Sequence, residues 1–183
     1  MTEIRWHGRG GQGAITASKI VATAAFNNGF TGAVMIPTFG TERRGAPIFS
    51  SLKIAREKIY DLSPIETPDI VVVLDHLLLN EVEVAKGLKE DGLIVLNTAK
   101  PVTAYDFGGV RLAVADVSAL SVEAGLPQGR VNSGIIGVLC RAFDIVPFAS
   151  VLDEIEAEFH GKRPRANADA ARLAYEHATV GVA

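Results

Sequence analysis

The sequence predicts a single α/β domain over residues 1–183, built on a mostly parallel β-sheet with helices on both faces. Strand-like and helix-like segments alternate along the chain with short polar joins, which is typical of βαβ order. Residues 70–74 (IVVVL) are apolar at every position, as in a central strand covered on both faces. Hydrophobic residues make up 48% of the chain but aromatic residues only 7%. This alanine- and valine-rich mixture favours helices that pack closely on a parallel sheet.

The first two elements flank a glycine cluster. Residues 3–7 alternate polar and apolar side chains and predict a strand. Residues 14–28 (AITASKIVATAAFNN) are alanine-rich and predict a helix that ends near Gly29. The cluster at residues 8–13 therefore joins the carboxyl end of a strand to the amino end of a helix.

The remaining elements follow from apolar runs and their spacing. The further strands that we predict are 33–36, 48–54, 70–74, 93–96 and 112–114. The further helices that we predict are 76–88, 132–146, 151–160 and 168–177, with Asn132 as the N-cap of its helix. We expect the last two helices to pack at one end of the molecule.

Composition excludes several classes of function. The formal net charge of −3 does not attract a polyanion, so we expect no nucleic-acid partner. Cys140 is the only cysteine, and one thiol can form neither an internal disulfide nor, by itself, an iron–sulfur cluster. The sequence has no run of about 18 apolar residues and no apolar stretch of a secretory signal at its start. We therefore expect a cytoplasmic protein without a membrane partner.

The glycine cluster is the sharpest local motif. GRGGQG satisfies G-x-G-x-x-G between a strand and a helix, which predicts a Rossmann-like turn. Glycines let the backbone approach a ligand, and free amides at a helix N-terminus attract a phosphate or carboxylate. The alternative is a tight turn that binds nothing. The candidate binding residues are Gly8, Arg9, Gly10, Gly11, Gln12 and Gly13.

A nicotinamide dinucleotide site also needs an acidic residue about 20 positions further on, at the end of the second strand, to hold the ribose. That strand ends here in Ile36-Pro37, and no carboxylate follows until Glu42. The sequence therefore argues against NAD binding of this type.

A second candidate loop, residues 37–47 (PTFGTERRGAP), follows the same strand. Arg43 and Arg44 can grip a carboxylate or phosphate as planar forks, and Glu42 can orient one of them or pair with a partner chain. A solvated charged turn is the alternative interpretation. Asp75 follows the buried strand 70–74 directly, so we expect it at the carboxyl edge of the sheet, where a ligand or neighbouring loop is met.

We expect structural roles for three other residues. His7 stands beside the glycine cluster, where a histidine is more often a hydrogen-bonding partner than an acid or base. Trp6 is expected in the core or in a subunit contact. Cys140 is expected to be a small buried hydrophobe.

Two motifs in order carry a resemblance to a known family. RGGQG within EIRWHGRGGQGAITASKI and ERRG within PTFGTERRGAP, followed by TPDIVVVLD, GLKEDGLIVLNT and VNSGIIGVL, resemble the gamma subunit or gamma domain of the 2-oxoacid:ferredoxin oxidoreductases. The resemblance spans roughly residues 3–145. It implies that the whole chain is one gamma-type domain of a complex that oxidatively decarboxylates a 2-oxoacid to an acyl-coenzyme A and carbon dioxide.

The resemblance also implies a division of labour among chains. Thiamine diphosphate with Mg²⁺ would lie between alpha and beta subunits, and [4Fe–4S] clusters would lie in beta or in a ferredoxin-like delta subunit. Electrons would pass to ferredoxin or, through a flavoprotein partner, to NAD. This chain would hold none of these cofactors. Asp91-Gly92 and Asn97 stand too close in sequence for the Asp-Gly and distant Asn that clamp magnesium at a thiamine diphosphate site.

The site hypothesis that follows has no catalytic residue and no metal ligand in this chain. The amides of residues 10–13 with Arg9, and the guanidinium groups of Arg43 or Arg44, would face coenzyme A phosphates or carboxylates on the alpha subunit. Glu42, Arg43, Arg44 and Asp75 are the expected partner contacts. Two other hypotheses stay open, a free-standing nucleotide-binding dehydrogenase and a purely structural assembly subunit. Selection among pyruvate, branched-chain, 2-oxoglutarate and aryl oxoacids is expected on other chains.

Overall fold

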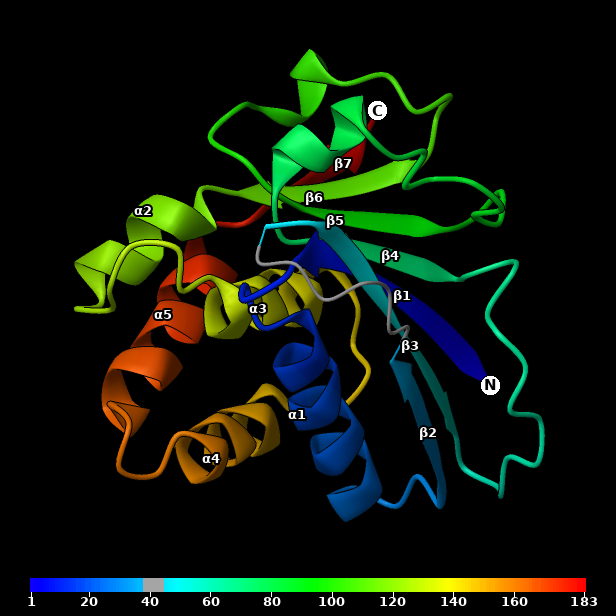
Figure 1. The fold of residues 1–183 in the computed structure, drawn as a ribbon, viewed down its shortest axis with the longest axis horizontal. Coiled ribbons are helices and arrows are strands. Elements are labelled where there is room, and N and C mark those ends of the chain that lie inside the picture. Colours follow the sequence, from blue (N-terminus) through cyan, green and yellow to red (C-terminus); the bar gives the residue numbers. More distant parts are fainter. Residues whose placement is uncertain (38–44) are drawn as a thin grey trace.

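The computed structural model describes residues 1–37 and 45–183. It contains one seven-stranded sheet with helices packed against it (Figure 1). The strands lie in the order β2-β3-β1-β4-β5-β6-β7. Their bounds are β1 Thr2–Arg9, β2 Gly32–Pro37, β3 Pro47–Ala55, β4 Ile70–Val73, β5 Leu93–Asn97, β6 Arg111–Ala115 and β7 Thr179–Val182. The helices are α1 Ala14–Asn27, α2 Val117–Glu123, α3 Asn132–Ala142, α4 Phe148–Glu158 and α5 Pro164–His177, with 3₁₀ helices η1 His76–Asn80 and η2 Val102–Ala104.

The mostly parallel character of the sheet is confirmed. β1, β4, β5 and β6 pair in parallel, and β2 points the same way as β1 because both pair antiparallel with β3. β3 and β7 are the two reversed strands, and β7 closes the sheet at the β6 edge. Five of the seven strands therefore end at the same edge of the sheet.

The α-helices cover one face of the sheet (Figure 1). Ile4 and Trp6 of β1 are fully buried beneath them, together with the alternate residues Val72 and Val95 of the neighbouring strands. The opposite residues, such as Val71 and Ile94, pack in a second core. These strands are therefore covered on both faces, as the continuous apolar pattern predicted.

The helices on the second face of the sheet are short 3₁₀ helices. The second face is covered by η1, η2 and irregular segments, whose Leu78, Val84 and Val102 are buried against the sheet. The predicted helix 76–88 is therefore wrong beyond Asn80. Residues 81–87 form consecutive turns, with the Val84 amide donating to the Val82 carbonyl at 2.8 Å and the Lys86 amide to the Glu83 carbonyl at 3.0 Å, and Gly87 adopts a positive φ of 76°.

Other element boundaries also differ from the predictions. The helix predicted over 132–146 ends at Ala142, those predicted from 151 and 168 start earlier, at Phe148 and Pro164, and α2 and β7 were not predicted. The N-cap of α3 is Val131, not Asn132, which is the first helical residue. No helix in the described ranges 1–37 and 45–183 is long and apolar enough to cross a membrane.

Helices α3 and α5 run parallel in close contact. Near their starts, Ser133 Oγ donates to Asn167 Oδ1 at 2.8 Å. Further on, a Cβ built on Gly137 would lie 2.0 Å from the carbonyl oxygen of Ala171. The absence of a side chain at Gly137 therefore lets the two backbones touch, with both helix N-termini at the same end.

Candidate functional site

The predicted glycine loop joins β1 to α1 through a compact turn. The amide of Gln12 donates to the carbonyl of Arg9 at 2.9 Å, and the Gln12 side chain accepts from the Arg9 amide at 2.8 Å. Gly11 and Gly13 have φ values of 94° and 83°, which glycine adopts without strain. The motif therefore encodes the turn directly.

The loop is also fastened to the start of β3. The amide of Gly10 donates to the carbonyl of Ala46 at 2.9 Å, and the amide of Gly45 donates to the carbonyl of Gly10 at 3.2 Å. Gly45 is the residue that follows the predicted Glu42, Arg43 and Arg44, which lie outside the described residues. Gly45 and Ala46, which follow these three residues, are therefore hydrogen-bonded to the glycine loop.

Two loop amides are open. Within residues 1–37 and 45–183, no acceptor reaches the amides of Gly11 and Gly13. They precede α1, whose first turn has no acidic residue and whose cap residue Gly13 has no capping side chain. Open amides and the positive end of a 14-residue helix together suit an anion.

The Arg9 side chain is bound internally by two carboxylates. Its Nε lies 2.7 Å from Asp75 Oδ2, its Nη2 lies 2.6 Å from Glu81 Oε1, and its Nη1 donates to the Gly45 carbonyl at 3.2 Å. Asp75 is 15% exposed at its side chain and Glu81 45%. Arg9 therefore links the glycine loop to the carboxyl end of β4 and to η1, and its charge is balanced within the chain.

These contacts shift the acidity of all three groups. The carboxylates hold the pKa of Arg9 above its usual value, because Arg9 donates hydrogen bonds to Glu81 and, second, to Asp75. The hydrogen bond from Arg9 holds the pKa of Glu81 below its usual range. Burial works to raise the pKa of Asp75, but hydrogen bonds from Arg9 and the Leu77 amide outweigh it and the pKa is lowered. The triad is fully ionised at neutral pH.

Asp75 lies at the carboxyl edge of the sheet as predicted, and it also caps a helix. Its Oδ1 accepts from the Leu77 amide at 3.0 Å and so starts η1, which carries the chain toward Glu81. Glu81 was not predicted, because no motif links it to the glycine loop. Only the turn that Asp75 starts brings it to Arg9.

The strand arrangement bears on dinucleotide binding. The second strand of a nicotinamide-binding unit lies parallel beside the first, so that its end faces the glycine loop. Here β3 and β4 are the neighbours of β1, and β2 is separated from it by β3. The end of β2 is therefore one strand removed from the position of a ribose-binding carboxylate, in agreement with the sequence argument against NAD.

His7 lies beneath the loop in a structural role, as expected. It is 6% exposed, and its Nε2 accepts from Arg5 Nε at 3.1 Å. Burial and, second, the charge of Arg5 lower its pKa to about 4. His7 is therefore neutral at physiological pH, with the hydrogen on Nδ1.

Asp91 and Asn97, whose sequence spacing does not fit a thiamine diphosphate site, also lie apart in the fold. Asp91 precedes β5 and Asn97 ends it, so they lie at opposite edges of the sheet. Asn97 Nδ2 already donates to the Leu74 carbonyl at 2.9 Å and to Ser118 Oγ at 3.1 Å. Among the described side chains, no group of three His, Cys, Asp or Glu residues is placed to hold a metal ion.

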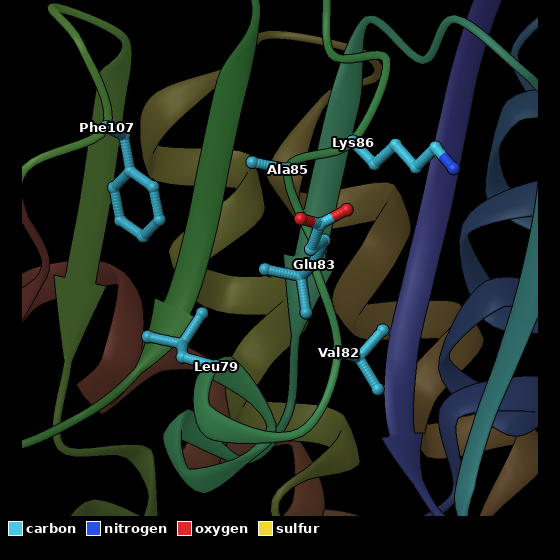
Figure 2. A pocket seen from close by; sticks show the side chains of 7 residues that line it. Leu79, Val82, Glu83, Ala85, Lys86 and Phe107 are labelled. Carbon is cyan, nitrogen blue, oxygen red and sulfur yellow. The ribbon is translucent and has the colours of Figure 1, made fainter.

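A separate hollow of about 410 Å³ lies on the face that lacks α-helices. Figure 2 shows Phe107 at one end of it and Lys86 at the other, with Leu79 and Val82 lower in the view. Its lining is largely apolar, and Glu83 and Lys86 are its charged members. It does not include the glycine loop or Asp75.

Comparison with known proteins identifies the family. The family model described as pyruvate ferredoxin/flavodoxin oxidoreductase matches residues 3–177. The chain belongs to this family. The resemblance carried by the two sequence motifs is thereby confirmed.

Relatives in the pyruvate ferredoxin/flavodoxin oxidoreductase family match the chain over nearly its full length. Pyruvate synthase subunit PorC of Methanothermobacter marburgensis is 42% identical over 176 residues, which cover 96% of this chain and 97% of the relative. The pyruvate/ketoisovalerate oxidoreductases common subunit gamma of Thermococcus litoralis is 42% identical over 185 residues, with 98% of each covered. The chain therefore matches both relatives over nearly their full length.

Solved structures of the family share the fold. The pyruvate oxidoreductase subunit PORC of Thermotoga maritima superposes with a TM-score of 0.85 at 33% identity, with 98% of both chains covered. The 2-oxoglutarate:ferredoxin oxidoreductase of Magnetococcus marinus, solved with 2-oxoglutarate, coenzyme A and succinyl-CoA bound, gives a TM-score of 0.71 at 20% identity. It covers 96% of this chain but 30% of that one. The family fold thus occurs both as a separate chain and as part of a longer one.

Proposed function

We propose that this chain is the gamma subunit of a 2-oxoacid:ferredoxin oxidoreductase complex, and that residues 1–183 form its single gamma-type domain. The observation that carries the proposal is the end-to-end match at about 40% identity to chains named as gamma or PorC subunits of pyruvate and ketoisovalerate oxidoreductases. The TM-score of 0.85 with the Thermotoga maritima PORC subunit supports it.

The complex converts a 2-oxoacid and coenzyme A to an acyl-coenzyme A and carbon dioxide, and it passes two electrons to ferredoxin or, through a flavoprotein, to NAD. Thiamine diphosphate with Mg²⁺ supplies the carbanion chemistry and [4Fe–4S] clusters carry the electrons, both on partner chains. The positions of Asp91 and Asn97 at opposite sheet edges, and a single cysteine, support the assignment of these groups to alpha, beta and ferredoxin-like delta subunits.

The role of this chain in the complex is positioning. The open amides of Gly11 and Gly13 and the N-terminus of α1 would face a phosphate of coenzyme A or a carboxylate of the alpha subunit. Arg9 would brace the loop, since Asp75 and Glu81 already neutralise its charge. Arg43 and Arg44, which precede Gly45 in the sequence, would supply positive charge.

A purely structural assembly subunit is the second candidate, and one experiment separates the two. The chain is co-expressed with its alpha, beta and delta partners, and 2-oxoacid-dependent ferredoxin reduction is measured against coenzyme A concentration. We expect the isolated chain to be inactive and the complex to be active. In the complex, Arg43→Ala with Arg44→Ala should raise the KM for coenzyme A or weaken assembly, whereas Lys58→Ala, an exposed control, should change neither.

The outcomes distinguish the roles. A raised KM with intact assembly supports contact with coenzyme A, and weakened assembly supports contact with the alpha subunit. If neither changes, the arginine loop is a solvated turn and the structural role alone stands. Turnover of a 2-oxoacid by the isolated chain would contradict the proposal altogether.

A further inference from the structure

The β3–β4 segment, residues 56–69, carries two strongly exposed apolar side chains. Tyr60 is 86% exposed, more than any other large apolar side chain in residues 1–37 and 45–183, and Leu62 is 65% exposed. The segment runs past the start of β1 to the start of β4, at the edge of the sheet opposite the glycine loop (Figure 1). Because water solvates such side chains poorly, neighbouring exposed apolar residues mark a contact surface.

A buried lysine fixes the segment between these two side chains. Lys53 of β3 is 1% exposed and stands opposite Glu3 in the register of β3 with β1, on the face without α-helices. Its Nζ donates to Asp61 Oδ2 at 2.7 Å and lies 3.6 Å from Glu3 Oε1. A buried lysine needs a carboxylate partner, so Asp61 is held inward while Tyr60 and Leu62 on either side of it remain exposed.

The β3–β4 segment is also fastened at both ends. Near its start, Thr31 Oγ1 donates to the Arg56 carbonyl at 2.7 Å. At its end, the Asp69 amide donates to the Glu3 carbonyl at 2.9 Å, and the Glu3 amide donates to Asp69 Oδ2 at 2.7 Å. The two exposed side chains therefore project from a backbone that is already ordered, which lowers the entropy cost of binding a partner.

The carboxylate between the two apolar side chains is neutralised within the chain. Asp61 is 57% exposed at its side chain, but one oxygen accepts from Lys53 and the other from the Ser63 amide at 2.9 Å. The hydrogen bond from Lys53 and, second, that from Ser63 hold the pKa of Asp61 below its usual range, so the ion pair persists at neutral pH. A partner that covers this surface therefore buries no unpaired charge.

The size of the surface decides what can cover it. Tyr60 and Leu62 together expose on the order of 300 Å², whereas each side of a stable protein–protein interface buries about 800 Å². These two side chains alone would therefore not hold two free copies of this chain together. They suit one anchor of a larger interface, in which a buried tyrosine often contributes strongly to affinity.

We propose that Tyr60 and Leu62 insert into an apolar recess on a partner subunit of the oxidoreductase complex. The inference rests on the proposed gamma-subunit role and adds to it a contact at the sheet edge opposite the glycine loop. The recess is expected to be uncharged where it meets the segment, because Lys53 already neutralises Asp61.

Native mass spectrometry of the co-expressed complex across a dilution series tests the proposal, because it counts the complexes that have lost this chain. Tyr60→Ser with Leu62→Ser should make the chain dissociate at a concentration roughly tenfold higher or more. Phe26→Ser, a change on α1 at a position that is 61% exposed, should not shift this concentration. Lys58→Ala, in the same segment but outside the apolar pair, should not shift it either. All these side chains are exposed, so the isolated variants should melt like the wild type.

A photo-crosslink identifies the neighbour directly. The photoreactive residue p-benzoylphenylalanine replaces Tyr60 in one complex and Phe26 in a control complex. Crosslinks to another subunit from position 60 only would support the proposal. Crosslinks from position 60 only to a second copy of this chain, none from an intact complex, or unchanged dissociation in the double variant would overturn it.

Two further results separate this inference from the proposed function. An equal loss in Phe26→Ser would mean that any exposed apolar side chain affects assembly, and the assignment to Tyr60 and Leu62 would be wrong. Failure of the unmodified chain to assemble with its partners would contradict the gamma-subunit role itself, and this inference with it.

Discussion

Gly13 illustrates how one residue can serve backbone geometry and packing together. Its φ of 83° is unfavourable for any side chain with a Cβ, and the Asn132 side chain occupies the place where that Cβ would stand. Gly11, two residues earlier, has a φ of 94°, but no atom of residues 1–37 and 45–183 lies within 4 Å of where its Cβ would stand. An alanine at Gly11 would therefore experience backbone strain alone, whereas an alanine at Gly13 would also clash with Asn132.

Gly13→Ala should destabilise the chain more than Gly11→Ala. Backbone strain alone predicts a loss of about 1–2 kcal/mol in the free energy of unfolding for Gly11→Ala. Gly13→Ala adds the displacement of Asn132, for a total of about 2–4 kcal/mol. Urea denaturation of both variants measures the difference. Equal losses would mean that Asn132 moves aside without cost.

The lowered pKa of His7 should make the free energy of unfolding depend on pH. In the folded chain its pKa is about 4, against an ordinary value of 6.5, because burial and the nearby Arg5 charge oppose protonation. Between these pH values the unfolded chain binds a proton that the folded chain does not. Stability should therefore fall as the pH drops from about 6.5 to about 4, by about 3 kcal/mol in total.

Denaturation at pH 7 and pH 4.5 measures this effect. His7→Gln keeps an acceptor for Arg5 Nε but cannot take up a proton in this range, so its stability should change less between the two pH values. His160→Gln, at an exposed position, serves as control and should retain the wild-type difference. An unchanged difference in His7→Gln would show that other groups carry the pH dependence.

At the residue scale, the features that could be predicted are those set by residues close together in the sequence. The glycine turn and the placement of Asp75 at a strand end follow from residues that are close in sequence. Glu81 could not be predicted as a site residue, because only a tertiary contact brings it to Arg9. No pattern within a few residues of Glu81 encodes that contact.

At the element scale, the predictions succeed for buried strands and fail for short or peripheral elements. Continuous apolar runs such as 70–74 and 93–96 are strands because both faces are covered. β7 is largely exposed and exists through its pairing with β6, and α2 has only seven residues. Their own sequences provide too little hydrophobic periodicity to reveal them.

The contact of α3 with α5 gives a prediction at this scale. Gly137→Ala would place a Cβ 2.0 Å from the Ala171 carbonyl oxygen, so the helices must separate. Gly134→Ala would place a Cβ 2.5 Å from Cγ1 of the buried Val117 side chain, which would have to shift. Because a side chain yields more easily than backbone and alanine favours helix by about 1 kcal/mol, Gly134→Ala should cost about 1 kcal/mol and Gly137→Ala about 2–4 kcal/mol.

Thermal unfolding of the two alanine variants tests this packing. A melting temperature that is lowered substantially in Gly137→Ala only would support the close backbone contact. Similar melting temperatures would mean that α5 can shift without loss.

At the scale of the whole molecule, the sheet order places the distinctive residues at one edge. β1 and β4 end there, and the antiparallel β3 starts there, so the glycine loop, Asp75 and Gly45 meet. Alternation of segments predicted the α/β class, but strand order depends on pairings across the chain. The insertion of β3 between β1 and β2 therefore had no local signal.

The division of labour in the complex can be tested through the only cysteine. Burial and, second, Asp144 raise the pKa of Cys140 to about 12, so its thiol stays protonated at neutral pH and is neither a nucleophile nor a metal ligand. Cys140→Ala should therefore leave both the iron content and the ferredoxin-reducing activity of the assembled complex unchanged. Iron analysis and turnover of wild-type and variant complexes check this. A folded, fully assembled variant that has lost iron would place a cluster ligand in this chain, and the assignment of all electron carriers to its partners would then be wrong.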